Sequence, residues 1–399
     1  MFLLGGLLAM ALPARAAYLL IPMDQTQTNH LKAYGVAYFV LQREVEISWL
    51  LNYKGGSYLI PYHDMFEREC KMRNVSYQVI ADAQASAILA QIADPGVNMD
   101  EMKLQKVPRV AVYAPKNSLP WDDAVTLVLT YAEIPYDVVY DDEVLQGLLP
   151  SYDWLHLHHE DFTGQYGKFW ARYHNYPWYQ EDVRLQEATA ARWGFSKVSQ
   201  LKLAVAKKIR EFVAGGGYMF AMCSAPDSFD IALAAEGLDI CDYMFDGDPI
   251  RPGDPQRLNY DNCFAFTDFS VSTNPQEYEV SNIDVPTTRM RTVNESNDYF
   301  LLFDFSANGI PCPPCSSSAT KSSSKALWDR LPPSVSLSSN PAWWCSATTP
   351  PSMRTAISTA ISVTVFGLFS AATIPRTTAI SWATRRPNST CTPTRPVID

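Results

Sequence analysis

Residues 196–237 read SKVSQLKLAVAKKIREFVAGGGYMFAMCSAPDSFDIALAAEG. The first half has apolar residues at the three- and four-residue spacing of an amphipathic helix, with Ser196 as its expected cap, and glycines 215–217 end that pattern. The apolar run Tyr218–Met222 follows and predicts a buried strand, after which a second helix is expected to reach Glu236. Helix, strand and helix joined by short loops are typical of an α/β protein with a parallel sheet.

The same alternation extends back to Pro108. The expected strands are Arg109–Tyr113, Tyr136–Tyr140 and Asp153–Leu157, with a helix over Pro120–Glu133 that Ser118 could cap and a short acidic helix after the second strand. Strands that alternate with helices predict a doubly wound, mostly parallel sheet, in which chemistry gathers at the carboxyl ends of the strands.

Residues 18–107 are expected to form a separate α/β part. Its expected strands are Tyr18–Pro22, Val45–Leu51, Ser57–Pro61 and Tyr77–Ile80, and its expected helices begin after Asn29, contain Phe66 to Met72, and span 82–93. The middle two strands flank the turn Lys54-Gly55-Gly56.

Residues 1–17 are expected to be a signal peptide. The apolar run Phe2–Leu12 is followed by Pro13 and then by Ala14–Ala16, an A-x-A pattern suited to signal peptidase. The run is shorter than the roughly 20 apolar residues of a membrane span, and no later segment reaches that length. No basic residue precedes the run, and a buried first strand is the alternative, which its glycines and proline disfavour. We therefore expect a mature chain from near Ala17, exported to the periplasm or cell envelope.

The overall composition is that of a globular protein. The chain has 399 residues, of which 47% are apolar and 19% charged, so it can bury a substantial core. A formal net charge of −10 disfavours nucleic acid as a partner, because phosphate binding requires a basic face. The eight cysteines are scattered without the spacing of a small disulfide scaffold, so no disulfide framework is expected.

Residues 311–399 differ from everything before them. Of these 89 residues, 42 are Ser, Thr or Pro and two are acidic. One interpretation is a disordered stalk. The other is a frameshift product, which explains the tryptophans and the apolar run Ile361–Phe369 better. With permissible codons, Ser370–Ile380 shifted by two nucleotides can read Gly-Gly-His-Asp-Pro-Glu-Asp-Tyr-Arg-His, which looks like a catalytic loop. We interpret the tail as non-native and disordered, produced by a frameshift.

The candidate nucleophile is Cys223, which directly follows the strand and precedes the second helix. Such a turn lifts a side chain above the sheet edge, toward the positive end of a helix. A thiol in that place has a lowered pKa and attacks more readily, and the backbone amides of Ser224 and Ala225 are then the expected oxyanion donors. The alternative is a small buried cysteine that fills space between helix and strand.

A second polar cluster consists of His158, His159 and Glu160, directly after a predicted strand in which His156 shares a face with His158. These groups can supply a base and a carboxylate beside Cys223, and we take all three as candidate catalytic residues. A divalent metal is the second interpretation, but no complementary His or Cys pair occurs at useful spacing. We therefore expect neither a metal nor a cofactor. The remaining alternative is a polar strand end that hydrogen-bonds loop backbone.

Three other patterns carry less weight. Cys312 and Cys315 resemble a redox or zinc pair, but they open the non-native tail. An aromatic segment predicts a lid or sugar platform, or packing against a long loop; it contains Tyr166, Trp170, Tyr173, Tyr176, Trp178 and Tyr179. Asp246, Asp248 and Asp254 suggest calcium, but they lack EF-hand spacing.

Five segments of the chain resemble an exported bacterial family commonly labelled asparagine synthetase B. They are Ile21–Asp24, Asn29–Gly35, Trp121–Leu127, Leu155–Gly167 and Ala221–Ala235. The resemblance covers nearly all of residues 18–310 and excludes the tail.

That family label implies glutamine-dependent amidation of aspartate with ATP. Synthetases of that name carry a catalytic cysteine at their processed first position and a Ser-Gly-Gly-x-Asp-Ser loop, and this sequence has neither. The architecture, over 108–310, is instead similar to the class I glutamine-amidotransferase-like fold, a flavodoxin-like arrangement. Enzymes of that fold use a cysteine on the elbow, a downstream histidine and an acid. Cys223 matches the cysteine, and the histidine would come from the loop that the shifted frame restores.

Two functional hypotheses follow. The first is an exported cysteine hydrolase or amidotransferase-like enzyme that uses Cys223 and is impaired in this chain. The second is a non-catalytic envelope protein that binds a small molecule or a partner. Neither hypothesis involves nucleic acid or a membrane span.

Overall fold

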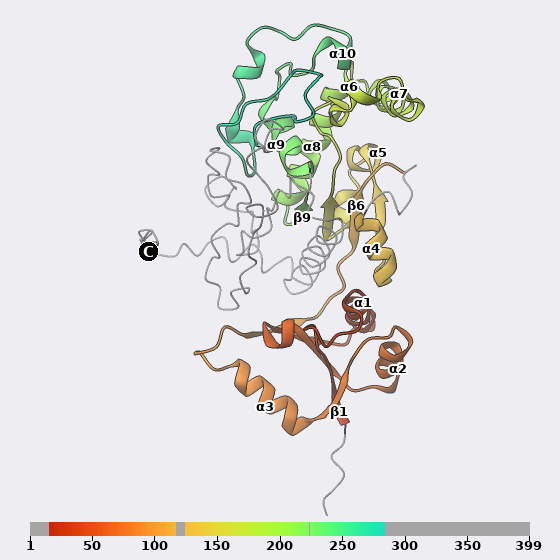
Figure 1. Ribbon diagram of the computed structural model, residues 1–399, viewed down its shortest axis with the longest axis vertical. Coiled ribbons are helices and arrows are strands. Elements are labelled where there is room, and N and C mark those ends of the chain that lie inside the picture. Colours follow the sequence, from red (N-terminus) through yellow and green to blue (C-terminus); the bar gives the residue numbers. More distant parts are fainter. Residues whose placement is uncertain (1–15, 117–123, 223, 284–399) are drawn as a thin grey trace, which may run out of the picture. The chain divides into compact units, whose positions relative to one another are not determined.

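The computed structural model describes residues 16–116, 124–222 and 224–283 (Figure 1). The chain forms two compact units. The first comprises the chain up to Val107 together with Val128–Ile134, and the second comprises the other described residues from Pro108 onward. One unit contains an antiparallel sheet and the other a parallel sheet, so the protein is α/β. The segment before Ala16, the expected cap Ser118 and the tail lie outside the described residues.

The first unit contains a five-stranded sheet in the order β4-β1-β3-β2-β5. Its strands are β1 Ala16–Ile21, β2 Ile47–Leu51, β3 Ser57–Pro61, β4 Gln78–Ala81 and β5 Asp100–Leu104, and its helices are α1 His30–Leu41, α2 Asp64–Met72 and α3 Asp82–Ile92. A cluster of buried apolar side chains joins α3 to β1, β2, β3 and β4.

Every pairing in this first sheet is antiparallel, so the prediction of a mostly parallel sheet holds only for the second unit. For β2 and β3 the physical reason is the turn between them. Asn52, Lys54, Gly55 and Gly56 all have positive φ angles, which reverse the chain within a few residues. A Cβ on Gly55 would lie 2.6 Å from the carbonyl oxygen of Met23, so this turn requires glycine.

The start of α1 agrees with the sequence prediction. The side chain of Asn29 accepts a hydrogen bond from the amide of Lys32 at 3.1 Å, as an N-cap residue should. Strand β5 was not predicted, because its sequence DEMKL lacks the apolar alternation by which strands are recognised. It forms an edge of the sheet and pairs only with β2 among the described strands.

The second unit contains a parallel sheet in the order β7-β6-β8-β9. Its strands are β6 Val110–Tyr113, β7 Asp137–Val139, β8 Trp154–Leu157 and β9 Tyr218–Ala221. Its helices are α5 Asp141–Leu145, α6 Trp170–Tyr173, α7 Pro177–Arg192, α8 Val198–Ala214, α9 Ala225–Ala234 and α10 Tyr243–Asp246, and α4 Ala124–Ala132 is divided between the units. The chain adds β7 on one side of β6, then β8 and β9 on the other, which creates a switch point.

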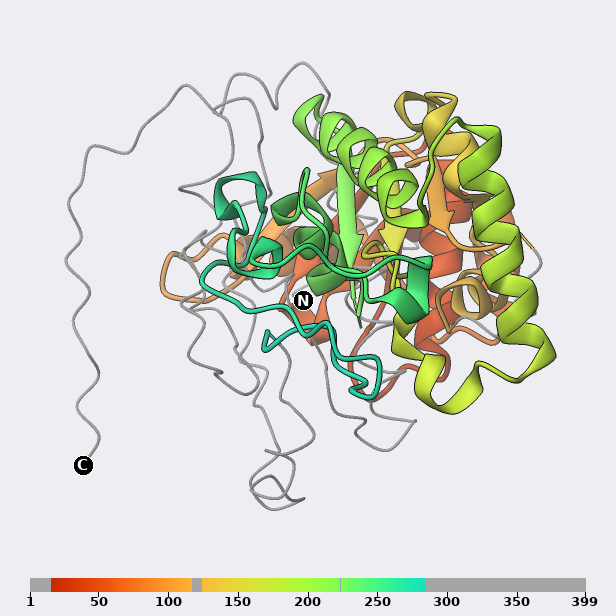
Figure 2. The ribbon, with the colours of Figure 1, turned by 90° about the horizontal axis from the view of Figure 1, so that it is seen from above.

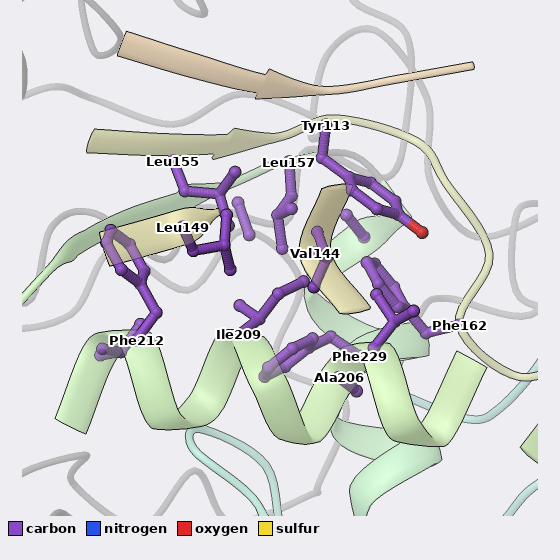
Figure 3. Close-up of a cluster of buried hydrophobic side chains, with 14 of the residues drawn as sticks. Tyr113, Val144, Leu149, Leu155, Leu157, Phe162, Ala206, Ile209, Phe212 and Phe229 are labelled. Carbon is purple, nitrogen blue, oxygen red and sulfur yellow. The ribbon is translucent and has the colours of Figure 1, made fainter. Parts of the chain in front are cut away.

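Helix α8 covers one face of this sheet (Figures 1 and 2). Its predicted stripe faces inward: Ile209 and Phe212 point toward Leu155 and Leu157 of β8 (Figure 3). All four are buried, with Leu155, Leu157 and Ile209 fully so. Burying such side chains contributes roughly 1.5–3 kcal/mol each, so this layer is a main source of the unit's stability.

The glycine run after α8 is required by its geometry. Gly216 has a φ of 95°, the left-handed conformation in which helices commonly end. A Cβ on Gly217 would lie 2.2 Å from the ring of Phe212. These two positions therefore allow the chain to turn tightly from α8 into β9.

One local prediction needs correction. Helix α8 begins at Val198 with Lys197 as N-cap, and Ser196 instead donates from its hydroxyl to the side chain of Gln200 at 3.1 Å. The aromatic segment forms α6 and the first turn of α7.

A buried ion pair joins α8 to the carboxyl ends of β6 and β7. The ammonium of Lys202 lies 2.9 and 3.0 Å from the two carboxylate oxygens of Asp141, and both side chains are 1% exposed. It also donates to the hydroxyls of Tyr113 and Tyr140, each at 3.2 Å, while the Tyr113 hydroxyl donates to Asp141 at 2.5 Å. Burial alone would lower the pKa of Lys202, but the charge of Asp141 acts together with Tyr140 and with the hydrogen bonds to both, and their combined effect raises that pKa.

We predict that Lys202→Met destabilises the second unit by about 3–5 kcal/mol, because it leaves the Asp141 carboxylate buried without its cation. The measurement is the free energy of unfolding from urea titration, followed by tryptophan fluorescence. The matched control is Lys208→Met on the same helix, whose partner Glu211 is 64% exposed and whose loss should cost less than about 1 kcal/mol. Equal costs for the two variants would contradict the prediction.

Candidate functional site

The candidate site lies at the carboxyl ends of β8 and β9, which are neighbours in the parallel sheet. Leu157 and Ala221 are paired across the two strands, so the residues that follow them emerge at the same edge. The amide of Met222 donates to the carbonyl of Leu157 at 3.1 Å. The sequence prediction that the loops after these strands meet is thus consistent with the topology.

Cys223 itself lies outside the described residues. The residues on its C-terminal side are held against the loop after β8. The hydroxyl of Ser224 donates to the carbonyl of His159 at 3.1 Å, and the hydroxyl of Ser228 in α9 donates to the carbonyl of Glu160 at 3.0 Å. Two hydroxyls from the β9–α9 segment therefore hold the main chain of residues 158–160, which we call the histidine loop.

The two histidines of this loop contact each other. Their Nδ1 atoms are 2.9 Å apart and their ring planes are nearly perpendicular, at 76°. A hydrogen bond between these two nitrogens requires one of them to carry the proton. His159 is exposed and His158 half-buried, so solvent or a bound molecule can reach both rings.

Glu160 is 6% exposed and serves the main chain of its own loop. One of its carboxylate oxygens accepts a hydrogen bond from the amide of His158 at 3.2 Å. This contact fixes the turn that carries the two histidines. Glu160 thus has a positioning role here, and a role as acid or base remains a prediction.

The expected oxyanion role of Ala225 does not fit its hydrogen bonding. Its amide donates to the carbonyls of Met222 and His158, at 3.2 and 3.3 Å. An amide that is already bonded to two carbonyls is not directed toward a developing oxyanion. The corresponding role of Ser224 remains a prediction.

His156 lies away from the accessible edge. It is fully buried within β8, where its ring lies 5.1 Å from that of Phe220. His158 follows the end of the strand, so the two histidines do not share a strand face as the alternation suggested.

The calcium interpretation is not supported, because a lysine already lies among these acids. The ammonium of Lys197 is 2.8 Å from Asp246 and 2.5 Å from Asp248. Asp254 is elsewhere engaged, by Arg251 and Arg257. No group of three or more metal-ligating His, Cys, Asp or Glu occurs in the described part of the chain. Cys312 and Cys315 lie outside it.

Aromatic packing explains most of the segment between Tyr166 and Tyr179. The rings of Tyr173, Trp178 and Phe169 contact one another at centroid distances of 5.3 to 6.0 Å. Tyr166 and Tyr179 are buried in the second apolar cluster of the unit. Tyr176 and Trp178 remain about half exposed at the surface.

Lys168 is a titratable group that sequence reasoning missed. It is 2% exposed, and its ammonium donates to the carbonyl of Asn274 at 2.7 Å. Burial lowers its pKa to about 8, a value that would suit a catalytic lysine. Among the described residues its hydrogen-bond partner is a main-chain carbonyl, however, so we interpret Lys168 as a residue that holds the loop containing Asn274.

Comparisons with protein-family models, curated proteins and solved structures found no match. None of the helices in the described ranges combines the length and apolar character of a membrane span.

Lys168 generates a prediction about pH. Its pKa is about 8 in the folded chain, whereas the ordinary pKa of a lysine is 10.5, so between these values the unfolded chain binds the proton more tightly. The free energy of unfolding should therefore rise as pH increases from about 8 toward 10.5, because the folded chain no longer buries a charged Lys168. The measurement is the urea unfolding free energy of wild type minus that of Lys168→Met. This difference should increase across the window, and a flat difference would show that burial does not perturb Lys168.

Proposed function

We propose that the protein is an exported cysteine hydrolase of the class I glutamine-amidotransferase-like type, with Cys223 as nucleophile. The observation that carries the proposal is the attachment of the histidine loop to the segment after β9, through the hydroxyls of Ser224 and Ser228. This attachment brings His158 and His159 to the sheet edge at which Cys223 follows the strand in sequence. The resemblance of residues 18–310 to the exported family adds support for the compartment and the fold.

The proposed reaction uses these groups in sequence. A thiolate at Cys223 attacks the carbonyl carbon of an amide or ester, and the oxyanion accepts a hydrogen bond from the amide of Ser224. His158 or His159 protonates the leaving amine or alcohol, so that a thioester remains on the cysteine. The same histidine then takes a proton from water, which attacks the thioester, releases the acid and regenerates the thiol.

This chain is proposed to be impaired. The resembling fold takes its histidine from a downstream loop, and all six histidines here precede residue 175. His158 or His159, which follow β8, must then take the catalytic role of that downstream histidine. The frame-corrected chain, which regains the Gly-His-Asp-Pro-Glu loop, should be the faster enzyme.

The proposal predicts selective alkylation of Cys223 by iodoacetamide, resolved by mass spectrometry of peptides. Its rate should rise with a midpoint below about 8.5, the pKa of an ordinary cysteine. Cys70 and Cys241 serve as internal controls, because both are buried and burial raises their pKa values, that of Cys70 to about 12. Labelling of Cys223 only in denaturant would contradict the proposal.

The histidines can be separated by substitution. His158→Gln or His159→Gln should raise the alkylation midpoint of Cys223, since either removes a neighbouring proton acceptor or positive charge. His174→Gln, in a histidine stacked on Trp170 at 4.6 Å, is the matched control and should leave the midpoint unchanged. Hydrolysis of p-nitrophenyl acetate and of L-glutamine, in this chain and in the frame-corrected chain, then tests turnover.

The alternative is a non-catalytic envelope protein that binds a ligand. The engaged amide of Ala225 favours it, because one of the two expected oxyanion donors is occupied. An inert Cys223 and no turnover in the frame-corrected chain would select this alternative.

A further inference from the structure

A cavity of about 400 Å³ lies within the second unit, away from the candidate site. Its wall includes Lys197 and Ser199 at the start of α8, and Ala232 and Ala235 at the end of α9. Ser224 lies at the opposite end of α9, so the cavity and the candidate site are at the two ends of one helix. This volume is in the range of small-molecule sites.

The charges in the wall are balanced. Lys197 and Arg251 supply two cations, and Asp239 and Asp248 supply two carboxylates. A wall without an excess of either sign gives no general preference for an anion or a cation. It suits a ligand that carries both signs.

One carboxylate oxygen of Asp239 is available to a ligand. The residue is 9% exposed, and its Oδ1 accepts a hydrogen bond from the amide of Cys241 at 3.3 Å. Its Oδ2 lies 3.9 Å from the ammonium of Lys197, beyond hydrogen-bond distance. Lys197 is drawn instead to Asp246 and Asp248, at 2.8 and 2.5 Å. Oδ2 can therefore accept hydrogen bonds from a ligand ammonium.

Arg251 supplies the complementary cation. One of its terminal nitrogens, Nη2, bonds to the carbonyl of Gly237 at 3.1 Å and to Asp254 at 3.0 Å. A guanidinium has five N–H donors in a planar fork, so others remain for a carboxylate. The side chain is 64% exposed, so a ligand can reach its remaining donors.

The rest of the wall includes apolar groups. Phe162 is fully buried and is held edge-on against Phe229 at 5.5 Å, which fixes its ring. Leu203, Leu238 and Ile240 complete this part of the lining. A ligand with an aliphatic group would bury it here, at roughly 25 cal/mol per Å².

We propose that this cavity binds a free α-amino acid with an apolar side chain, as a zwitterion. Its ammonium bonds to Asp239, its carboxylate to Arg251, and its side chain lies against Phe162 and the aliphatic residues. Asp239 and Arg251 both line the cavity, so each of the two charges of an α-amino acid can meet an opposite charge in its wall. An uncharged apolar ligand would strip water from Asp239 and Arg251 without replacing its hydrogen bonds.

The test is isothermal titration calorimetry of the full chain with L-leucine. Saturable binding is expected, and N-acetyl-L-leucine and L-leucinamide should each bind at least about tenfold more weakly, since each lacks one charge. Absence of saturable binding up to on the order of 10 mM would overturn the proposal. Equal binding of all three compounds would also overturn it, because recognition would then be apolar only.

Variants assign the contacts. Asp239→Asn keeps the acceptor for Cys241 and should weaken the binding of L-leucine and of L-leucinamide at least about tenfold, because both carry the ammonium. The binding of N-acetyl-L-leucine, which lacks the ammonium, should change little. Arg251→Gln should weaken L-leucine binding similarly. The matched control is Arg257→Gln, which also removes a contact to Asp254 but does not line the cavity. Unchanged melting temperatures verify folding, and an equal loss of binding in Arg257→Gln would overturn the assignment to Arg251.

Discussion

The ion pair between Lys202 and Asp141 is the constraint on which the second unit depends. Neither charge is exposed, so each tolerates burial only because the other lies within 3 Å and two tyrosine hydroxyls complete the shell. The pair sets the position of α8 over the ends of β6 and β7. It also fixes Tyr113, whose ring stacks on Phe162 at 5.2 Å. Phe162 follows the histidine loop by two residues, so the core and the candidate site are connected through this ring.

A second buried carboxylate organises the region after α9. Asp230 is fully buried and accepts hydrogen bonds from three consecutive amides, those of Phe264, Ala265 and Phe266, at 2.7 to 2.9 Å. A carboxylate surrounded by amide donors replaces the water it loses on burial. This contact holds an irregular loop against the helix, which is why Phe264 can join the core beside Phe229.

Helix α9 lies between the two proposed sites. At its start, Ser224 and Ser228 hold the histidine loop, and the proposed nucleophile Cys223 immediately precedes them. At its end, Ala232 and Ala235 leave room for the cavity because they are small. The two proposals are independent, since one concerns the reactivity of a thiol and the other the binding of a zwitterion.

The sequence by itself determined the local elements. The stripe Leu201, Val205, Ile209 and Phe212 predicted α8, and Asn29 predicted the start of α1, because side-chain periodicity and capping are properties of neighbouring residues. Tertiary structure alone decided the pairing of β1 with β4 and of β2 with β5, the burial of Lys202 and the engagement of the Ala225 amide. Each depends on a partner distant in the chain. Lys202 lies on the apolar face of α8, and its burial is tolerable because it pairs with Asp141, which lies 61 residues earlier. The cavity likewise combines segments whose only relation is their position in the fold.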